Sequence, residues 1–521
     1  MKAAAFFLLM FASALQAEMV LRAGNGAEPN TLDPHKSEGT SDANIIRDVY
    51  EGLTNLSPRG EAVPGAAERW EVSADGLTYI FSLRERARWS NGDPLTADDF
   101  VAGMRRCVAP DTGSGYAMNL APLLNAEAVI AGKLPVESLG VEALDARTLR
   151  IRLKAPAPYL PGLLTHATTF AVHRPSLRQH GAGFARPGKL IGNGAYVLAE
   201  WGVQSHIKLT RNRHYWNDAA TRIDTVLYYP TEDVDSELKR YRAGELDITY
   251  DVPQSRAPQL RAELGDQLRA APYLGTWYLG FNLTRAPLAN QPKLRRALNL
   301  AVDRELIAER VMNGFAIPAY SWVPPGVAGY SPQTPAWAAW PLAQRQAEAR
   351  RLYAEAGYSA ERPLEIEIHY NTQRDNQRIT TVVAAMWKQT LGVHARLVNL
   401  EFKVLKTLLR QRLTQVFRWG WIGDYNDAGS FADILQSRHG QNMPAYSDPQ
   451  YDALVARANT QADAAARRAL LQDAERHMLE QSPLIPIYFY RSTHLIKPQV
   501  QGWQDNLLDY HYSKDLAVIQ P

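Results

Sequence analysis

The sequence predicts an α/β protein built from more than one domain. Apolar residues alternate along residues 364–370, recur at helical spacing along 379–386 and alternate again along 393–397, which is the order of a strand–helix–strand unit. The chain has 521 residues, and domains of about 100–200 residues imply two to four of them. A content of 46% apolar and 21% charged residues is that of an ordinary soluble globular protein.

Charge and cysteine content exclude several classes of protein. The chain has 57 basic and 54 acidic residues, a net charge of +3, and its nearest approach to a basic run, Arg410-Gln-Arg412, is too short to bind nucleic acid. The single cysteine, Cys107, allows no intrachain disulfide and is best explained as a small buried residue. An excess of aromatics, 12 Trp and 24 Tyr, fits a recognition surface.

The first 17 residues are predicted to be a signal peptide. Lys2 supplies the positive charge, and residues 3–14 form an apolar stretch too short to span a bilayer. Cleavage is expected after Ala14 or Ala17, with Ala17 preferred. No cysteine follows to carry a lipid anchor, and no later stretch is apolar enough to cross a membrane. We therefore expect an exported, soluble mature protein, which in a double-membraned bacterium means the periplasm.

The first quarter of the mature chain carries clear helix and strand signals. Apolar residues at 45, 46 and 49 lie on one side of an expected helix, and those at 79, 81 and 83 alternate as in a strand. Asn91-Gly92 indicates a hairpin turn. Thr96-Ala-Asp-Asp99 is typical of a helix N-cap with acids in the first turn.

Three later segments also have predicted structures. Residues 288–310 carry an apolar residue at every fourth position from 294 to 306, which predicts one helix that stops before Gly314. Residues 331–341, with three prolines and two Trp, are expected to form a loop held by packing. Residues 470–479 have the apolar spacing of a late helix that ends before Pro483.

The stretch from Arg418 to Asn426 (Arg-Trp-Gly-Trp-Ile-Gly-Asp-Tyr-Asn) has the most unusual composition. It combines one cation, one anion, three large aromatics and two glycines in nine residues. One interpretation is a pocket, in which aromatic walls exclude water and Arg418 and Asp424 pair with the two ends of a zwitterion. The other is a core strand and a turn, in which both charges form salt bridges with the rest of the fold. The residue types alone leave both open.

Short motifs follow one another in a fixed order along nearly all of the mature chain: Asp33-Pro-His-Lys-Ser-Glu38, Glu68-x-Trp70, Leu83-Arg84, Trp89-Ser-Asn-Gly92, Thr96-Ala-Asp-Asp-Phe100, Gly192-Asn-Gly-Ala-Tyr196, Tyr215-Trp-Asn217, Tyr241-Arg-Ala-Gly-Glu-Leu-Asp247, Arg295-Arg-Ala-Leu-Asn299 and Arg418 to Asn426. In content, order and spacing they resemble the large extracytoplasmic peptide-binding proteins of ABC importers, solute-binding protein family 5. Within that family the sequence is most similar to the oligopeptide-binding branch.

The resemblance implies a fold. It is the two-lobed α/β periplasmic-binding-protein fold of class II or cluster C type, with an extra inserted α/β domain and the ligand in the cleft between the lobes. Carried onto this chain, the domains would be residues 18–50, 174–274 and 492–521 for the discontinuous lobe I, 51–173 for the extra domain II and 275–491 for lobe III. The hinge strands would lie near residues 274 and 491, which fall in apolar and aromatic runs.

The resemblance also implies a binding site. Asp424 would bind the peptide ammonium, Arg418 the carboxylate of shorter peptides, and Gly420 and Ile422 the peptide main chain. Further matched positions would line the pocket: Glu38, Thr40, Tyr116, His166, Trp277, Tyr278, Phe402, Trp421, Tyr425 and Tyr490. Four of these also have an ordinary structural explanation. Tyr278 and Tyr490 could be core residues of hinge strands, a lone histidine such as His166 is more often structural, and Phe402 is ambiguous for the same reason.

Two departures from the family pattern bear on the ligand. Many relatives carry a disulfide between cysteines at the positions of Gly275 and Ile422, and this chain has neither cysteine. A histidine that often meets the carboxylate of longer peptides is replaced by Asn376, between Arg374 and Arg378. We therefore expect tripeptides anchored by Arg418 to bind at least as well as tetrapeptides.

The function implied is that of the periplasmic substrate-binding component of a peptide ABC transporter. Such a protein captures short peptides by hinge closure, as a monomer without metal, cofactor or catalysis, and delivers them to an inner-membrane permease driven by ATPase subunits. One alternative keeps the fold with a specialised ligand: a murein peptide, an opine, a nickel chelate or haem. A chaperone or surface sensor shares the fold. A secreted hydrolase is disfavoured, because Gly-x-Ser-x-Gly and His-Glu-x-x-His are absent and Ser236-Glu-Leu-Lys239 lacks partner motifs.

Overall fold

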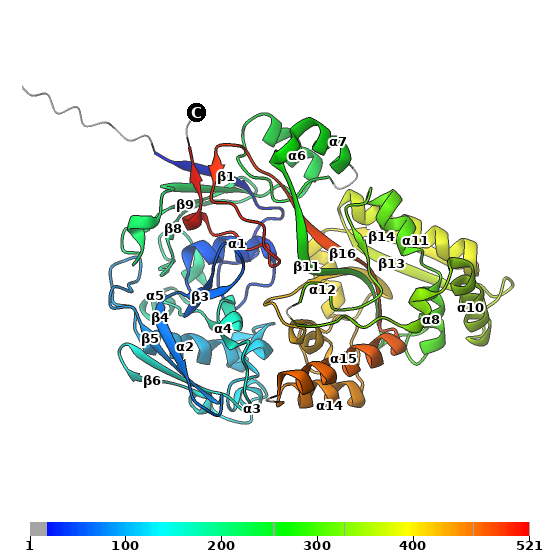
Figure 1. Cartoon of the computed structure of the whole chain (residues 1–521), viewed down its shortest axis with the longest axis horizontal. Coiled ribbons are helices and arrows are strands. Elements are labelled where there is room, and N and C mark those ends of the chain that lie inside the picture. The colour runs from blue at the N-terminus through cyan, green and yellow to red at the C-terminus, as the bar shows by residue number, and fades with distance from the viewer. Residues whose placement is uncertain (1–17, 254–255, 328, 462, 520–521) are drawn as a thin grey trace, which may run out of the picture.

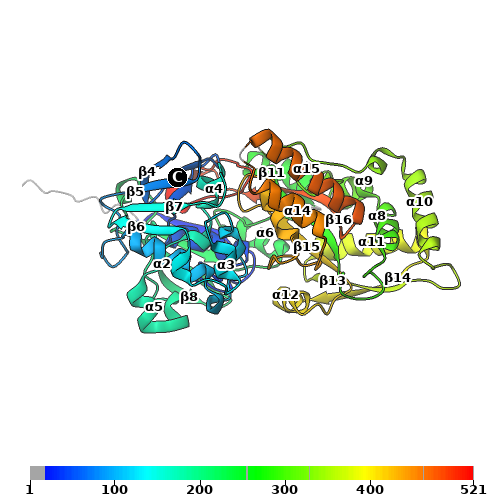
Figure 2. The ribbon, with the colours of Figure 1, turned by 90° about the horizontal axis from the view of Figure 1, so that it is seen from below.

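The structure is a computed structural model that describes residues 18–253, 256–327, 329–461 and 463–519. The predicted signal peptide lies outside these ranges. Among the described residues, no helix combines the length and the apolar character needed to cross a membrane. The two views of the ribbon show two lobes side by side, with long strands running between them (Figures 1 and 2).

The first lobe contains two four-stranded sheets. One has the order β1(Val20–Gly24), β10(Thr225–Tyr229), β9(His206–Arg211), β8(Tyr196–Gly202), with β1 and β10 parallel and the other pairs antiparallel. The other is wholly antiparallel in the order β4(Ala67–Val72), β5(Thr78–Leu83), β7(Thr148–Arg152), β6(Val141–Asp145). Two short ribbons complete the strands of this lobe: β2(Thr54–Leu56) with β3(Ala62–Pro64), and β17(Val500–Gln501) with β18(Ala517–Val518).

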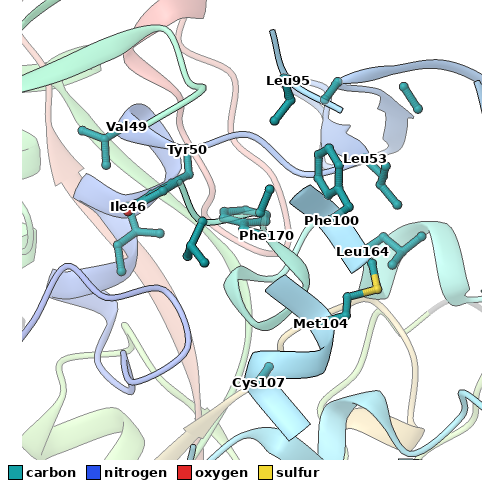
Figure 3. Packing of buried hydrophobic residues seen from close by; sticks show 14 of the residues in the cluster. Ile46, Val49, Tyr50, Leu53, Leu95, Phe100, Met104, Cys107, Leu164 and Phe170 are labelled. Carbon is teal, nitrogen blue, oxygen red and sulfur yellow. The ribbon is translucent and has the colours of Figure 1, made fainter. Parts of the chain in front are cut away.

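Seven α-helices belong to the described part of this lobe: α1(Thr40–Val49), α2(Ala97–Val108), α3(Ala126–Ile130), α4(Leu160–Leu163), α5(Arg174–His180), α6(Val234–Arg242) and α7(Ala257–Leu264). The expected cap of α2 is present, because the Thr96 backbone N–H donates to the Asp99 carboxylate at 3.0 Å. Figure 3 shows Phe100, Met104 and Cys107 along α2, with Phe170 beside them. Cys107 is fully buried there, and burial raises the pKa of its thiol to about 12, so it acts as an apolar core residue.

The second lobe is built on one six-stranded mixed sheet. Its order is β12(Ile317–Pro318), β16(Leu484–Leu495), β11(Leu268–Phe281), β15(Val416–Ile422), β13(Glu365–Asn371), β14(His394–Leu400). The predicted strand–helix–strand unit is confirmed, because β13 and β14 are parallel and the helix α11(Arg374–Leu391) connects them. That helix ends at Gly392, whose φ of +75° is the left-handed conformation that glycine adopts readily.

The other α-helices described in the second lobe are α8(Pro292–Leu300), α9(Arg304–Leu306), α10(Leu342–Glu355), α12(Phe402–Arg410), α13(Gly429–Ala432), α14(Pro449–Ala458) and α15(Ala464–Gln481). The predicted late helix corresponds to α15. The predicted loop at 331–341 contains one short 3-10 turn, Ala336–Ala339, and packing does hold it, since Trp337 is buried in the core.

The single helix predicted for residues 288–310 is wrong. Helix α8 ends at Leu300, and Asp303 starts a new one by accepting a hydrogen bond from the Leu306 backbone N–H at 3.0 Å. The chain then continues as a π-helical turn, Ile307–Val311. Leu306, which completed the apolar stripe, is 41% exposed. The cap at Asp303 changes the direction of the chain and takes this leucine off the buried face.

The two lobes are joined by β11 and β16, which pair antiparallel along most of their length. Leu268 at the start of β11 packs in a cluster of the first lobe, and Phe281 at its end packs in the core of the second. The pairing is irregular between Pro272 and Thr276, where the ladder skips the residues near Tyr490. This break lies where the strands pass from one lobe to the other.

Candidate functional site

The turn after β15 places Asp424 between the lobes. Its backbone N–H donates to the Ser430 hydroxyl at 2.9 Å, which fixes the turn within the second lobe. Its carboxylate faces the first lobe, where the Asn119 amide donates to Oδ2 at 3.3 Å and His166 Nε2 lies 3.6 Å from Oδ1. Only 12% of the side chain is exposed. The carboxylate is therefore nearly enclosed by partners that come from both lobes.

The partners of Asp424 carry no positive charge at neutral pH. The Thr168 backbone N–H donates to His166 Nδ1 at 3.3 Å, which leaves the proton of a neutral ring on the Nε2 that faces Asp424. Burial lowers the pKa of His166, with Asp424 opposing the shift, so the ring is neutral at pH 7. Burial in turn raises the pKa of Asp424, against the weaker pull of His166 and Asn119. A cation placed here would relieve the cost of burying this carboxylate.

Aromatic rings surround this acid. Tyr116 of the first lobe lies against His166, with ring centroids 5.3 Å apart, and stacks on Trp421 of β15 at 6.2 Å. The Trp421 indole N–H donates to the Ser430 carbonyl at 2.9 Å, which satisfies its one polar atom. Tyr425 stacks on Tyr159 of the first lobe at 5.5 Å, nearly parallel. Aromatic rings from both lobes thus pack together around the turn that carries Asp424.

Arg418 lies in β15, six residues before Asp424, and is also held by neutral groups. Its guanidinium donates to Asn371 Oδ1 at 3.1 Å and to the Tyr490 hydroxyl at 2.8 Å, and it lies over the Trp277 ring at 5.5 Å. Among the described residues, no carboxylate comes within ion-pair distance of it. The two charges of the 418–426 stretch therefore form ion pairs neither with each other nor with the described part of the fold.

The main chain of β15 has one strand partner along this stretch. On one side β11 pairs with it throughout, with Trp277 opposite Gly420 and Gly275 opposite Ile422. On the other side β13 pairs only with residues 416 and 417. Within the described residues, the second edge of β15 from 418 to 422 has no strand beside it. That edge can accept an extended peptide as an added strand.

Glu38 and Thr40 come from the first lobe. Glu38 forms an ion pair with Lys406 of α12 at 2.7 Å and a second with Arg410, and its side chain is only 8% exposed. Burial alone would raise the pKa of Glu38, but the two cations hold it below the ordinary value. The Thr40 hydroxyl lies 2.5 Å from the Tyr250 hydroxyl. Glu38 thus connects the first lobe to a helix of the second.

Three other predicted site residues contribute packing. Phe402, the first residue of α12, stacks on Trp419 at 5.5 Å with the rings nearly parallel. Trp277 is fully buried, and its indole N–H donates to Asn376 Oδ1 at 3.1 Å. Tyr278 is 1% exposed and packs edge-on against Trp322 in the core. Trp277 and Tyr278 are therefore enclosed in the second lobe, whereas the other predicted residues lie at or near the junction of the lobes.

The pair Gly275 and Ile422 has a steric explanation in this chain. The two residues face each other across the β11–β15 ladder. A Cβ added to Gly275 would overlap Ile422 Cδ1 and approach Tyr490 Cδ2 within 2.9 Å. The isoleucine side chain thus fills the space beside this glycine, and packing takes the place of a covalent link.

The sequence alone missed several residues of this region. Asn119 and Asn371, the partners of Asp424 and Arg418, carry no charge and stand out in no motif. Lys406 and Arg410 carry a weak signal, because two cations four residues apart would share one face of a helix, and both lie on α12 in the structure. Their common partner Glu38 lies more than 360 residues earlier in the chain, and this pairing requires the fold.

Comparison with known proteins supplies the family. Residues 61–443 match the family described as bacterial extracellular solute-binding proteins, family 5 Middle. The periplasmic oligopeptide-binding protein OppA of Salmonella typhimurium is 38% identical over 500 residues, covering 95% of this chain and 92% of OppA. The murein peptide-binding protein MppA of Escherichia coli is 38% identical over 499 residues, with the same coverage. The probable deoxycholate-binding protein YgiS of E. coli is 39% identical over 507 residues, covering 97% and 94%.

Solved structures show the same relationship. The E. coli murein tripeptide-binding protein MppA superposes with a TM-score of 0.94 at 36% identity, over 97% of this chain and 99% of MppA. Haemophilus influenzae OppA in complex with the peptide RPPGFSPFR gives 0.93 at 35% identity, with the same coverage. An unliganded open form of MppA gives only 0.70 at 37% identity, over 97% and 98% of the two chains.

These scores bear on both the fold and the state of the lobes. The high scores confirm the predicted two-lobed α/β fold with its extra domain. The lower score against the open form, together with the contacts of Asp424, Tyr425 and Glu38 across the lobes, indicates a closed arrangement here. The chain belongs to the bacterial extracellular solute-binding protein family 5.

Proposed function

We propose that this chain is the periplasmic receptor of a peptide ABC importer and binds the main chain of short peptides between its lobes. One observation carries the proposal: Asp424 is a carboxylate buried at the junction of the lobes, and its described side-chain partners are neutral. A peptide ammonium would supply the missing positive charge through a charge-assisted hydrogen bond. The periplasmic oligopeptide-binding relatives support the same ligand class.

The remaining contacts fit the other parts of a peptide. The free edge of β15 from residue 418 to 422 offers backbone donors and acceptors that do not depend on the peptide sequence. At about 3.3 Å per residue this edge is roughly 13 Å long, the length of a tri- or tetrapeptide. Arg418, whose side-chain partners among the described residues are neutral, lies at its far end and would take the peptide carboxylate.

The surroundings of Asn376 support the prediction that tripeptides bind at least as well as tetrapeptides. The amide of Asn376 is engaged by the Trp277 indole and by Asn371, so it is part of the packing. The flanking cations have carboxylate partners, because Arg374 pairs with Asp235 at 3.0 Å and Arg378 with its neighbour Asp375 at 3.4 Å. The position where longer peptides would end thus offers weaker attraction than Arg418. Affinity that rises sharply from tripeptide to tetrapeptide would contradict this prediction.

The proposed mechanism is binding without chemistry. The peptide enters between separated lobes, the lobes close by bending at β11 and β16, and the closed form docks on an inner-membrane permease driven by ATPase subunits. We propose a monomer that needs no metal or cofactor for this task. A murein peptide is the alternative ligand, because MppA is as similar to this chain as OppA is, and a murein peptide also presents ionic ends.

The first experiment identifies the ligand and the role of Asp424. Mass spectrometry of small molecules released on denaturation should find mixed short peptides for a general receptor and one species for a specialised one. Titration calorimetry then compares trialanine with N-acetyl-trialanine on the native chain and on Asp424→Asn. We expect both the acetyl group and the substitution to cost about 2–5 kcal/mol of binding free energy. The exposed Asp473→Asn serves as the control, and equal affinity for both peptides would refute the role of Asp424.

A further inference from the structure

A second polar cluster, which shares no residue with the proposed peptide site, lies where the C-terminal segment crosses β16. His494 Nε2 is 3.0 Å from each carboxylate oxygen of Asp509, and His511 Nε2 is 2.9 Å from Asp509 Oδ1. The three potential ligand atoms all lie within 4.8 Å of one another. Two imidazoles and a carboxylate are the ligand types that zinc, nickel and copper ions prefer.

The two rings are already oriented for such a role. His494 Nδ1 lies 2.9 Å from the Thr249 carbonyl oxygen, which can only accept, so Nδ1 carries a proton and Nε2 points at Asp509. A backbone carbonyl in this position is the usual outer support of a metal-binding histidine. The Trp503 ring stacks on His511 at 3.5 Å between centroids and meets His494 edge-on at 5.0 Å. Neither imidazole can turn away without losing these contacts.

The third ligand is held in a backbone conformation that costs energy. Asp509 has a φ of +55°, in the left-handed region that residues other than glycine rarely adopt. This conformation places its carboxylate between the two imidazoles. The side chains of His494, Asp509 and His511 are 9%, 16% and 11% exposed, so the cluster is shielded but has an approach from solvent.

We propose that His494, Asp509 and His511 form a binding site for one divalent transition-metal ion of the zinc, nickel and copper class. Three protein ligands leave a fourth position for water or a small anion, as in sites that are not purely structural. The proposal does not rest on the proposed peptide binding, for which we propose no metal. Without the ion, the hydrogen bonds described above join both histidines to Asp509. The competing explanation of the cluster is that it is a structural ion-pair network that binds no metal.

The site would fasten the C-terminal segment near the hinge. Tyr510, between two of the proposed ligands, lies under the Arg47 guanidinium at 3.8 Å from its ring centroid. Slightly earlier in the same segment, the Leu507 carbonyl accepts from the Leu274 backbone N–H in β11 at 2.7 Å. An ion held by Asp509 and His511 would therefore stabilise a segment that packs against both connecting strands. Zinc should accordingly raise the melting temperature of the chain.

The test uses the mature chain without a polyhistidine tag, treated with a chelator and titrated with zinc chloride in a calorimeter. We expect one zinc ion per chain. His511→Asn keeps an amide donor for Asp509 but removes the imidazole ligand, and should weaken zinc binding by at least about tenfold. His477→Asn is the matched control, because His477 pairs with Asp448 at the same 2.9 Å but belongs to no cluster of potential metal ligands among the described residues. Zinc affinity should be unchanged in that variant.

Two further measurements separate a metal site from a structural ion pair. Zinc should raise the melting temperature of the native chain and of His477→Asn, but not that of His511→Asn. Anomalous diffraction from zinc-soaked crystals of the native chain, which needs no variant, should place the ion among the three side chains. Absence of zinc binding, equal affinity in His511→Asn, or an anomalous peak elsewhere would each overturn the proposal.

Discussion

Gly420 keeps Tyr490 and Arg418 in contact because it has no side chain. A Cβ built on this residue would overlap the Tyr490 hydroxyl, the same hydroxyl that accepts the Arg418 hydrogen bond at 2.8 Å. A glycine at this position also lets a ligand approach the backbone of β15 closely. The structure adds a second reason, since the glycine also makes room for the residue that orients the guanidinium.

Gly420→Ala should therefore weaken peptide binding through Arg418. The added methyl group displaces the Tyr490 hydroxyl, and loss of a hydrogen bond to a charged group costs about 1.5–3 kcal/mol. Titration with trialanine should show this loss, while a peptide amide without the terminal carboxylate should be affected less. Gly183→Ala is the control, because a Cβ there meets nothing within 4 Å. Equal losses of binding free energy for trialanine and for its C-terminal amide would show that the effect of Gly420→Ala does not pass through Arg418.

A different single residue, Glu475, should govern part of the pH dependence of stability. It is buried in the second lobe, where its carboxylate accepts from Trp322 N–H at 2.8 Å and from the Tyr330 hydroxyl at 2.8 Å. Burial raises its pKa from 4.5 to about 7, with these hydrogen bonds opposing the shift. Between these two pH values the folded chain holds a proton that the unfolded chain has lost.

The free energy of unfolding should consequently rise as the pH falls from about 7 to 4.5. A shift of this size corresponds to about 3 kcal/mol over the whole window. Urea unfolding at a series of pH values measures it, and Glu475→Gln should flatten this part of the curve. A slope that is the same in the variant and the native chain would assign the effect to other groups.

At the scale of elements, the sequence predicted what depends on local periodicity. The strand–helix–strand unit at β13, α11 and β14 follows from apolar spacing and a terminal glycine. The break between α8 and α9 did not, because apolar spacing continues through it. Besides the cap at Asp303, long-range contacts hold the new helix in place: the Arg304 guanidinium is buried and donates to the carbonyls of Ala319 at 2.7 Å and Pro486 at 2.8 Å. Ala319 directly follows β12 and Pro486 lies in β16, so neither partner can be predicted from the apolar spacing of residues 288–310.

The residues of the candidate site also fall into two groups: those that the sequence indicates and those that only the fold brings together. Asp424 and Arg418 stood out because a charged residue among aromatics and glycines is unusual in any single stretch. Their partners did not, since Asn119 lies 305 residues from Asp424 and reaches it only when the lobes close. Sequence composition can indicate charges that need a ligand, but the neutral groups that surround them depend on packing between distant segments.

The helix α12 offers a test of closure at this scale. Lys406 pairs with Glu38 of the first lobe at 2.7 Å, so the pair exists only when the lobes are together. Lys406→Gln should speed peptide dissociation about 5- to 100-fold, equivalent to about 1–3 kcal/mol, with little change in the association rate. Lys403→Gln on the same helix is the control, because the exposed Lys403 forms no ion pair among the described residues. Stopped-flow kinetics measures the dissociation rate, and equal rates for the two variants would contradict the prediction.

For the whole molecule, closure has a cost that the peptide can remove. Bringing the lobes together surrounds Asp424 with Asn119, a neutral His166 and aromatic rings. Burying a carboxylate without a counter-charge is unfavourable. In the absence of a cationic ligand, the free-energy cost of burying Asp424 opposes the favourable contacts between the lobes, such as the Tyr159–Tyr425 stack. A ligand ammonium stabilises the closed state far more than the open one, which is the condition for shifting the equilibrium.

The empty chain should accordingly be open in solution, and a free-amine peptide should close it. Small-angle X-ray scattering should show the radius of gyration decreasing as trialanine is added, while N-acetyl-trialanine at the same concentration leaves it unchanged. In Asp424→Asn the buried charge is gone, so the empty variant should be more compact than the empty native chain. A native chain that is already compact without peptide, or an empty variant no more compact than it, would show that Asp424 does not control closure.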